Sequence, residues 1–387
     1  MLLAKQNAAF WRPFFYLHLS LLAMGLLPGT QTSLISQFQE SRFFVSLDYG
    51  QGQTLRHRPS MVFDLPNPAR DYRLEISQVV DGSEAWHKPY HFPIVGAGIL
   101  LLDYGNPDVL GRTFSTYFFV DHNYLSVGRL SLFGRFEKGI AFHSKAFDPE
   151  TNPLNNAIGS NINLHASLGL GLRIRVYRRT ILRIGGYFSH QSNSRFSFPN
   201  LGLNTVKVLV GANIFSFGER SITRRQAPKD FDFPTWHKMV SFGLGIKEEK
   251  RVEGPRYPVY MLRFQMARNI KNKRRIIGGI EAKWDLAKAA FVRNQGIDDP
   301  MVEFQSFDPS ISLGHEYLMG HVGLLTQANL RLKEPFQGNN YWSVKVGSNL
   351  YVHSNYRHPK SNLFVGIYIN ANKAVADFLE FAVGYQF

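Results

Sequence analysis

A histidine and a serine two residues apart are the pair in this sequence best suited to breaking an ester bond. His190 and Ser192 end a stretch in which side chains of two kinds alternate, as they do in a strand. In a strand, residues i and i+2 point to the same side, and their Cα atoms are about 7 Å apart. An imidazole and a hydroxyl at this spacing can meet, and the imidazole can then take the proton of the hydroxyl. His190 is therefore a candidate general base and Ser192 a candidate nucleophile.

The residues that follow could serve the same reaction. Asn193 and Asn200 carry amide N–H groups that could hold the oxyanion formed when an ester carbonyl is attacked. Arg195 could hold a phosphate group of the substrate. The residue types also fit a second interpretation, in which a histidine, several serines and several asparagines only make a polar loop.

The alternation indicates which side of the strand carries the pair. The face of His190 and Ser192 has no charge, whereas the opposite face contains Arg183. The residues that share the uncharged face are Leu182, Ile184, Gly186 and Phe188. We expect this face to contact lipid, which would place the pair on an outer wall.

The end of the chain indicates a lipid environment. From Leu379 to Phe387, every second residue is apolar or aromatic, the residues between are small or polar, and the last residue is phenylalanine. This pattern resembles the terminal strand of Gram-negative outer-membrane β-barrels, whose assembly machinery reads a terminal aromatic strand. The resemblance implies that Phe387 is recognised by the barrel-assembly machinery and that the protein resides in the cell outer membrane.

The N-terminus has the pattern of a secretory signal. Lys5 and Arg12 precede an apolar stretch from Phe14 to Leu27 that contains no acidic residue. The alternative, a single membrane helix, would need about 20 apolar residues. We expect residues 1–32 to be a cleaved signal peptide and residues 40–387 to form the barrel.

The alternating segments predict an all-β, antiparallel transmembrane β-barrel of fourteen to sixteen strands, within a range of twelve to sixteen and with an even number. We expect one domain whose last strand pairs with its first, because neither edge can stay unpaired in lipid. The candidate strands are 43–50, 70–79, 93–102, 113–120, 128–139, 161–176, 179–189, 204–217, 237–247, 257–268, 274–286, 309–319, 321–332, 342–352, 361–370 and 376–387. The longer outer loops are expected to include 140–160, 190–203 and 287–308.

The composition and net charge limit the classes of molecule that this protein could bind. The formal net charge of +15 fits a basic lumen, cationic side chains that hold the phosphates of lipopolysaccharide, or both. Nucleic acid is a poor candidate for an exported barrel. The absence of cysteine excludes a disulfide scaffold and thiolate chemistry. His315, Glu316 and His321 do not have the spacing of a helical zinc motif, so we expect no metal and no cofactor.

The segment His190–Asn193, followed by Asn200–Gly202, resembles the active site of PagL-type lipid A deacylases, which has the pattern His-x-Ser-Asn and then an Asn-x-Gly turn. The resemblance implies that His190 is the base, that Ser192 is the nucleophile, that Asn193 and Asn200 serve the oxyanion, and that lipid A of lipopolysaccharide is the substrate. The compact motif covers only about fifteen residues. The longer chain resembles the larger, acyloxyacyl-hydrolase-type members found in Bacteroidota, which share segments such as Asp103–Pro107, Asp148–Pro153, Asn156–Ser160 and Phe198–Asn204.

One position departs from that family. Its triad acid is a glutamate where this sequence has Asn204. An amide can hold the tautomer of a histidine, but it cannot supply the charge that stabilises imidazolium. Three possibilities follow: an enzyme in which Asn204 orients His190, an acid from another loop such as Glu150, or a pseudoenzyme. The rival function is a non-enzymatic barrel, either a porin or transport protein or a structural protein.

Overall fold

The computed structural model describes residues 41–177, 180–219, 236–249, 252–270, 273–333, 341–353, 361–372 and 375–387. The expected signal peptide, residues 1–32, lies outside these residues. Among the described residues, no helix is both long enough and apolar enough to cross a membrane.

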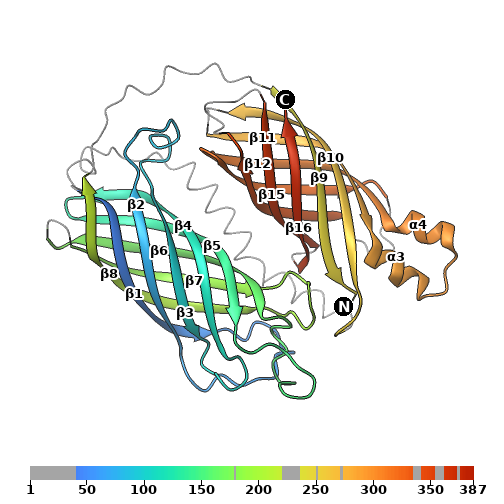
Figure 1. The fold of residues 1–387 in the computed structure, drawn as a ribbon, viewed down its shortest axis with the longest axis horizontal. Coiled ribbons are helices and arrows are strands. Elements are labelled where there is room, and N and C mark those ends of the chain that lie inside the picture. Colours follow the sequence, from blue (N-terminus) through green and yellow to red (C-terminus); the bar gives the residue numbers. More distant parts are fainter. Residues whose placement is uncertain are drawn as a thin grey trace. The chain divides into compact units, whose positions relative to one another are not determined.

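The described chain is an antiparallel, mostly β structure with sixteen strands, within the predicted range of fourteen to sixteen. The first eight strands close into one barrel and the last eight into another (Figure 1). The first barrel consists of β1 (Ser41–Thr54), β2 (Ala69–Val79), β3 (Ile94–Asp103), β4 (Arg112–Val127), β5 (Leu130–His143), β6 (Ile162–Arg175), β7 (Ile181–Ser192) and β8 (Leu203–Glu219). The second consists of β9 (Trp236–Glu248), β10 (Arg256–Ile270), β11 (Arg274–Asp285), β12 (Phe307–Met319), β13 (Val322–Arg331), β14 (Trp342–Tyr351), β15 (Asn362–Asn372) and β16 (Val375–Gln386).

The expected closure of a single barrel, with the last strand on the first, is wrong. Strand β8 closes on β1, and β16 closes on β9. Each barrel satisfies the requirement that no strand edge stays unpaired in lipid, but it does so with eight strands. Alternation along a strand encodes its two faces and not its partner, so the pattern could not distinguish one closure from two.

The alternation of side chains is the reason that these segments form barrel walls. On β16, Phe381, Val383 and Tyr385 are exposed outward, whereas Glu380 and Gln386 are buried in the lumen. On β4, Phe118 is 76% exposed. The outer walls thus present apolar and aromatic side chains to lipid, and the polar residues point inward.

Paired charges fill the lumen of the first barrel. Arg135 bonds both Asp121 and Glu75, and Arg73 bonds Glu137. The second barrel repeats the arrangement, with Arg275 on Glu316. Buried charges are tolerated when each has a partner, and the interior of an eight-stranded barrel is just wide enough for side chains to fill it. The basic residues of these lumens are therefore neutralised locally, and the packing gives no support to a wide pore.

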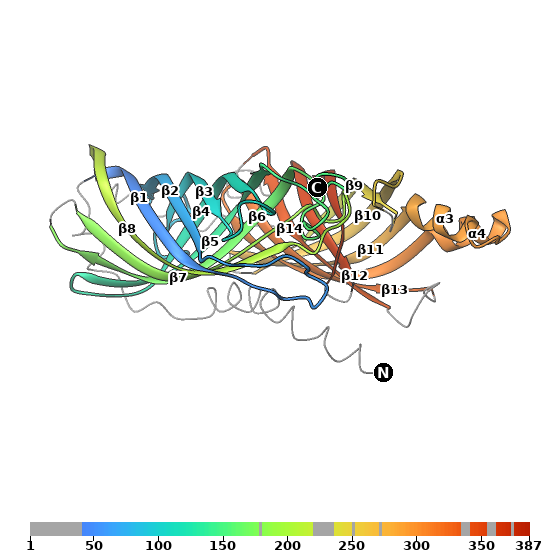
Figure 2. The same cartoon turned by 90° about the horizontal axis from the view of Figure 1, so that it is seen from below.

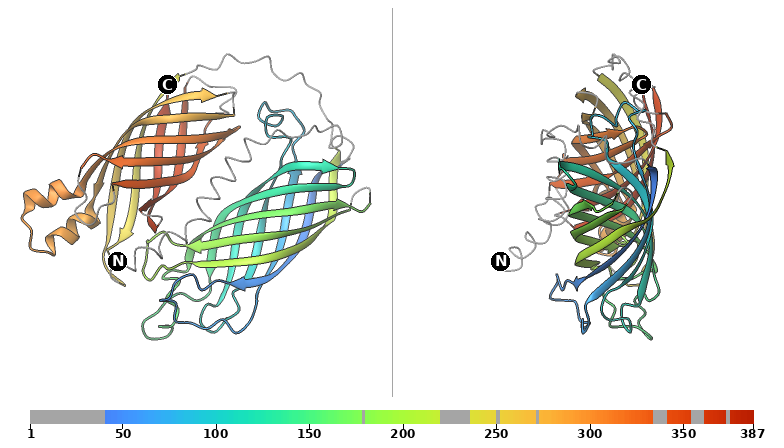
Figure 3. Two further views of the ribbon diagram at one scale, coloured as in Figure 1. Left: turned by 180° about the vertical axis from the view of Figure 1, so that it is seen from behind. Right: turned by 90° about the vertical axis from the view of Figure 1, so that its left-hand side faces the viewer.

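Between β11 and β12, where the sequence pattern predicts an outer loop, the chain forms two short helices (Figures 1 and 3). They are α3 (Leu286–Arg293) and α4 (Asp299–Ser306). The side chain of Asp285 caps α3 by accepting from the backbone N–H of Lys288 at 3.1 Å. The segment lacks a sustained helical pattern in the sequence, and this is why the sequence predicts a loop there.

The chain divides into two compact units, and Figure 2 shows their strands from below. Of the described residues, the first unit contains those within 41–193 and 199–219, and the second contains those within 236–387. The second unit also includes five residues from the connection between β7 and β8, Ser194–Phe198.

Candidate functional site

The candidate pair lies at the end of β7, on the outward face of the first barrel. Leu182 and Ile184, which have the same parity as His190, are 44% and 45% exposed. On β8 the outward side chains Val206 and Val208 are exposed as well. In the antiparallel register, His190 lies directly opposite Asn204, so their side chains are neighbours on one face.

Three side chains are linked by two hydrogen bonds. His190 Nε2 is 2.9 Å from Ser192 Oγ, and His190 Nδ1 is 2.6 Å from Asn204 Oδ1. Because an amide oxygen only accepts, Nδ1 carries the ring proton and Nε2 is left to accept from the Ser192 hydroxyl. This is the tautomer that a general base needs. The Nδ2 of Asn204 is buried and has no hydrogen-bond partner within the described residues.

Gly202 packs directly against the imidazole. Its φ is +77°, and a Cβ placed on it would lie 2.7 Å from His190 Cε1 and 3.4 Å from the Cβ of Ser192. Its backbone N–H donates to Ala157 O at 3.0 Å. A side chain at this position would meet both backbone strain and the ring. The role of Gly202 is not evident from the residue types of the candidate site, although Gly202 is the glycine of the Asn-x-Gly turn.

Asn193 and Asn200 close the loop around Ser192. The backbone N–H of Asn193 donates to Asn200 Oδ1 at 3.1 Å. The Nδ2 of Asn193 donates to Ser160 Oγ at 2.9 Å, so the Asn156–Ser160 segment braces this loop. Ser192 is only 6% exposed.

Two other candidates lie elsewhere. Glu150 has an exposed side chain in a turn where its N–H donates to Asp148, and the group on His190 Nδ1 is Asn204. The guanidinium of Arg195 bonds the carboxylate of Asp377 at 2.7 Å. The structure therefore brings together His190, Ser192, Asn193, Asn200 and Asn204, and it pairs Arg195 with an acid.

Comparison with known proteins gives two family matches. Residues 71–213 match the family model described as lipid A 3-O-deacylase (PagL), and residues 235–387 match the model described as acyloxyacyl hydrolase, C-terminal domain. The first range contains His190, Ser192 and Asn204, and the second coincides closely with the second barrel. No curated protein matches the chain.

Several solved structures resemble the chain in part. The outer membrane enzyme PagL is 18% identical, with a TM-score of 0.31, over 43% of this chain and 97% of that one. Neisserial surface protein A is 8% identical, with a TM-score of 0.31, over 44% and 94%. Outer membrane protein Omp33 of Acinetobacter baumannii is 6% identical, with a TM-score of 0.17, over 90% and 99%.

Proposed function

We propose that His190 and Ser192 remove an ester-linked acyl chain from lipid A in the outer membrane, because residues 71–213, which contain this pair, match the model of the PagL lipid A 3-O-deacylases. The observation that supports the proposal is a pair of hydrogen bonds. His190 bonds Ser192 through Nε2 and Asn204 through Nδ1. The pair faces outward, on the side of the barrel that contacts lipid.

In the proposed reaction, Ser192 Oγ attacks the ester carbonyl while His190 Nε2 takes the hydroxyl proton. The tetrahedral intermediate collapses to an acyl-enzyme, and the proton on Nε2 passes to the departing sugar oxygen. Water then attacks the acyl-enzyme, with His190 again acting as base, and releases the fatty acid. Asn204 keeps the ring in the productive tautomer but adds no charge to stabilise the imidazolium.

Amide groups beside Ser192 are the proposed oxyanion donors. Asn200 turns its Oδ1 toward the N–H of Asn193, which leaves its Nδ2 to donate to the oxyanion. Asn193 contributes by holding the loop in place through Ser160. Preorganised donors of this kind stabilise the charge that develops on the carbonyl oxygen.

A lipid-facing site receives its substrate from the side. The bilayer presents the acyl chain along the outer wall, so the reaction needs no cavity in the barrel. A phosphate of lipid A is proposed to contact those N–H groups of Arg195 that Asp377 does not take.

The test of this function is the lipid A mass spectrum of outer membranes with and without the protein. We expect the protein to remove the mass of one acyl chain, and the Ser192→Ala chain, produced at the same level, to leave lipid A unchanged. If the wild-type chain also leaves lipid A intact, the protein is a pseudoenzyme or a non-enzymatic barrel.

Assembly is proposed to depend on the terminal aromatic residue. Phe387 is 51% exposed, and its backbone N–H and C=O both bond Lys238. Deletion of Phe387, or Phe387→Lys, should lower the amount of protein in the outer membrane because the assembly machinery would lose its aromatic signal. Fractionation and immunoblotting measure this amount, and Phe387→Tyr serves as the aromatic control. Normal levels of the truncated chain would contradict the proposal.

A further inference from the structure

Lys138 lies on the lipid-facing wall of the first barrel. Its neighbour on β5, Glu137, is 0% exposed and bonds Arg73 in the lumen, so Lys138 points to the opposite face. Phe118, which lies directly opposite Lys138 on β4, is 76% exposed, and Ile140, two residues further along β5, is 45% exposed. A cationic side chain on a lipid-facing wall is costly, and such residues usually have a function.

The strand register places Lys138 level with the proposed catalytic pair. Lys138 lies opposite Ala166 of β6, and Ala166 lies opposite His190 of β7. Side chains that are directly opposite in an antiparallel sheet share a face, so the three residues form a row across the outer wall. Because neighbouring strands are about 4.8 Å apart, the Cα atoms of Lys138 and His190 are about 10 Å apart. Asn204 continues the row on the other side of His190.

The side chains of this row suit a substrate that lies across β6. Between Lys138 and His190, the row contains only the methyl group of Ala166. The lysine side chain is a flexible four-carbon stem that ends in a point charge. Its ammonium can therefore meet an anionic group of the same lipid molecule whose ester lies at Ser192. The proposed reaction steps make no use of this cation.

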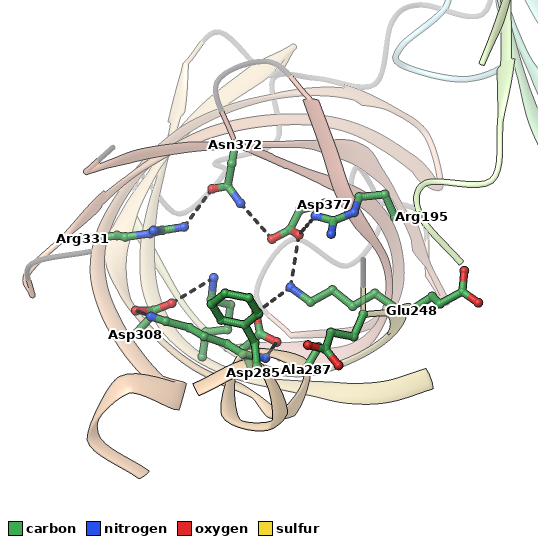
Figure 4. A pocket seen from close by; sticks show the side chains of 13 residues that line it. Arg195, Glu248, Asp285, Ala287, Asp308, Arg331, Asn372 and Asp377 are labelled. Atoms are coloured by element: carbon green, nitrogen blue, oxygen red, sulfur yellow. Dashed lines mark hydrogen bonds and ion pairs between the residues drawn. The ribbon is translucent and has the colours of Figure 1, made fainter. Parts of the chain in front are cut away.

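Lysines that point into the barrels have a different role. In the first barrel, Lys207 bonds Asp71 at 2.6 Å, and both side chains are fully buried. In the second barrel, Lys247 bonds Asp285 and Asp377, two acids labelled in Figure 4. These lysines neutralise buried acids within the same barrel. Lys138 faces the membrane instead, where the anions of the outer leaflet are lipid headgroups.

We propose that Lys138 binds a phosphate of lipid A and so determines which lipids the esterase accepts. The ammonium holds the phosphate on the β5 side of the row while the acyl ester lies at Ser192, and Asn204 lies on the far side of His190. The proposal deepens the proposed function and rests on it for the identity of the substrate. This contact is separate from the one proposed for Arg195, which lies in the connection beyond the end of β7.

The first test measures binding without catalysis. The full-length Ser192→Ala chain in detergent micelles is titrated with lipid A and with lipid A from which the phosphates have been removed. Adding Lys138→Met removes the charge and keeps the length of the side chain, and we expect the Kd for lipid A to rise about 10- to 100-fold, because a hydrogen bond between charged groups is lost. The Kd for the dephosphorylated lipid should not change. Lys138→Arg should restore most of the affinity, since it retains the cation.

The matched control is a second lysine of the same barrel. Lys145 is exposed in the connection between β5 and β6, where its Nζ donates to Asp108 O at 2.6 Å. Lys145→Met makes the same change in net charge away from the row. It should leave the Kd for lipid A within about twofold, because an exposed charge is screened by salt.

The second test measures catalysis in chains that retain Ser192. Lys138→Met should raise KM for acyl release from lipid A and leave kcat within about twofold, since it removes a contact made equally before and during the reaction. Neither constant should change for an uncharged p-nitrophenyl ester, which has no phosphate. The split between the two substrates distinguishes phosphate binding from damage to the catalytic pair.

Three results would overturn the inference. They are an unchanged Kd for lipid A in Lys138→Met, an equal loss of affinity for the dephosphorylated lipid, and a folded Lys138→Arg chain that binds no better than Lys138→Met. A wild-type chain that releases no fatty acid but binds phosphorylated lipid A through Lys138 would overturn the proposed reaction and support this site.

Discussion

Ser192→Ala and His190→Ala should each lower the rate of acyl release from lipid A by roughly 10³-fold or more, because each removes one half of the unit that forms the acyl-enzyme. The hydrogen bond of 2.9 Å between Nε2 and Oγ is the reason to expect losses of similar size. The double variant should be little worse than either single one, since residues that act as a unit have non-additive effects. The measurement is fatty-acid release in detergent micelles.

Variants of Asn204 distinguish its role in orienting His190 from the effect of a negative charge beside the ring. The same assay measures both. Asn204→Ala should cost only about 10- to 100-fold, because the His–Ser pair remains. Asn204→Asp should raise the rate about tenfold, since a carboxylate stabilises the imidazolium that forms in the transition state. Asn204 is 1% exposed and its Oδ1 already lies 2.6 Å from the ring, so aspartate fits the space better than the longer glutamate.

Full activity in Ser192→Ala would show that the site is assigned wrongly. An Asn204→Asp variant that is folded but slower than the wild type would show that the amide is the better partner at this lipid-facing position. Retention of the heat-modifiable barrel on gels provides the folding control for every variant.

Gly202→Ala should abolish most activity although it adds one methyl group. The new Cβ would lie 2.7 Å from His190 Cε1, a distance that requires the imidazole to move, and the φ of +77° adds backbone strain. A displaced ring loses its bond to Ser192, so we expect a fall of at least about 100-fold in kcat.

Gly186 provides the matched control for this substitution. It lies on the same outward face of β7, and a Cβ added there would meet nothing within 4 Å. Gly186→Ala should therefore leave acyl release unchanged. If Gly202→Ala also left acyl release unchanged, the close packing of the imidazole against this turn would not matter for catalysis.

The sequence by itself determined the strands and their faces. Each of the sixteen predicted segments overlaps one observed strand, because in a barrel wall every second residue meets lipid and the alternation is therefore recorded residue by residue. The same rule correctly placed His190 on the face of Leu182 and Ile184. The spacing of His190 and Ser192 also fixed their proximity, since two residues on one face of a strand are neighbours.

Only the tertiary structure decided which strands close on which. Strand β8 pairs with β1 and β16 with β9, and alternation carries no information about pairing partners far apart in the chain. The contact of Asn204 with His190 follows from the cross-strand register, and the contact of Arg195 with Asp377 spans 182 residues of sequence. Such contacts depend on where the whole chain folds back, which no local pattern records. The sequence therefore indicated that Arg195 could contact a phosphate, but it could not indicate the pairing of Arg195 with Asp377.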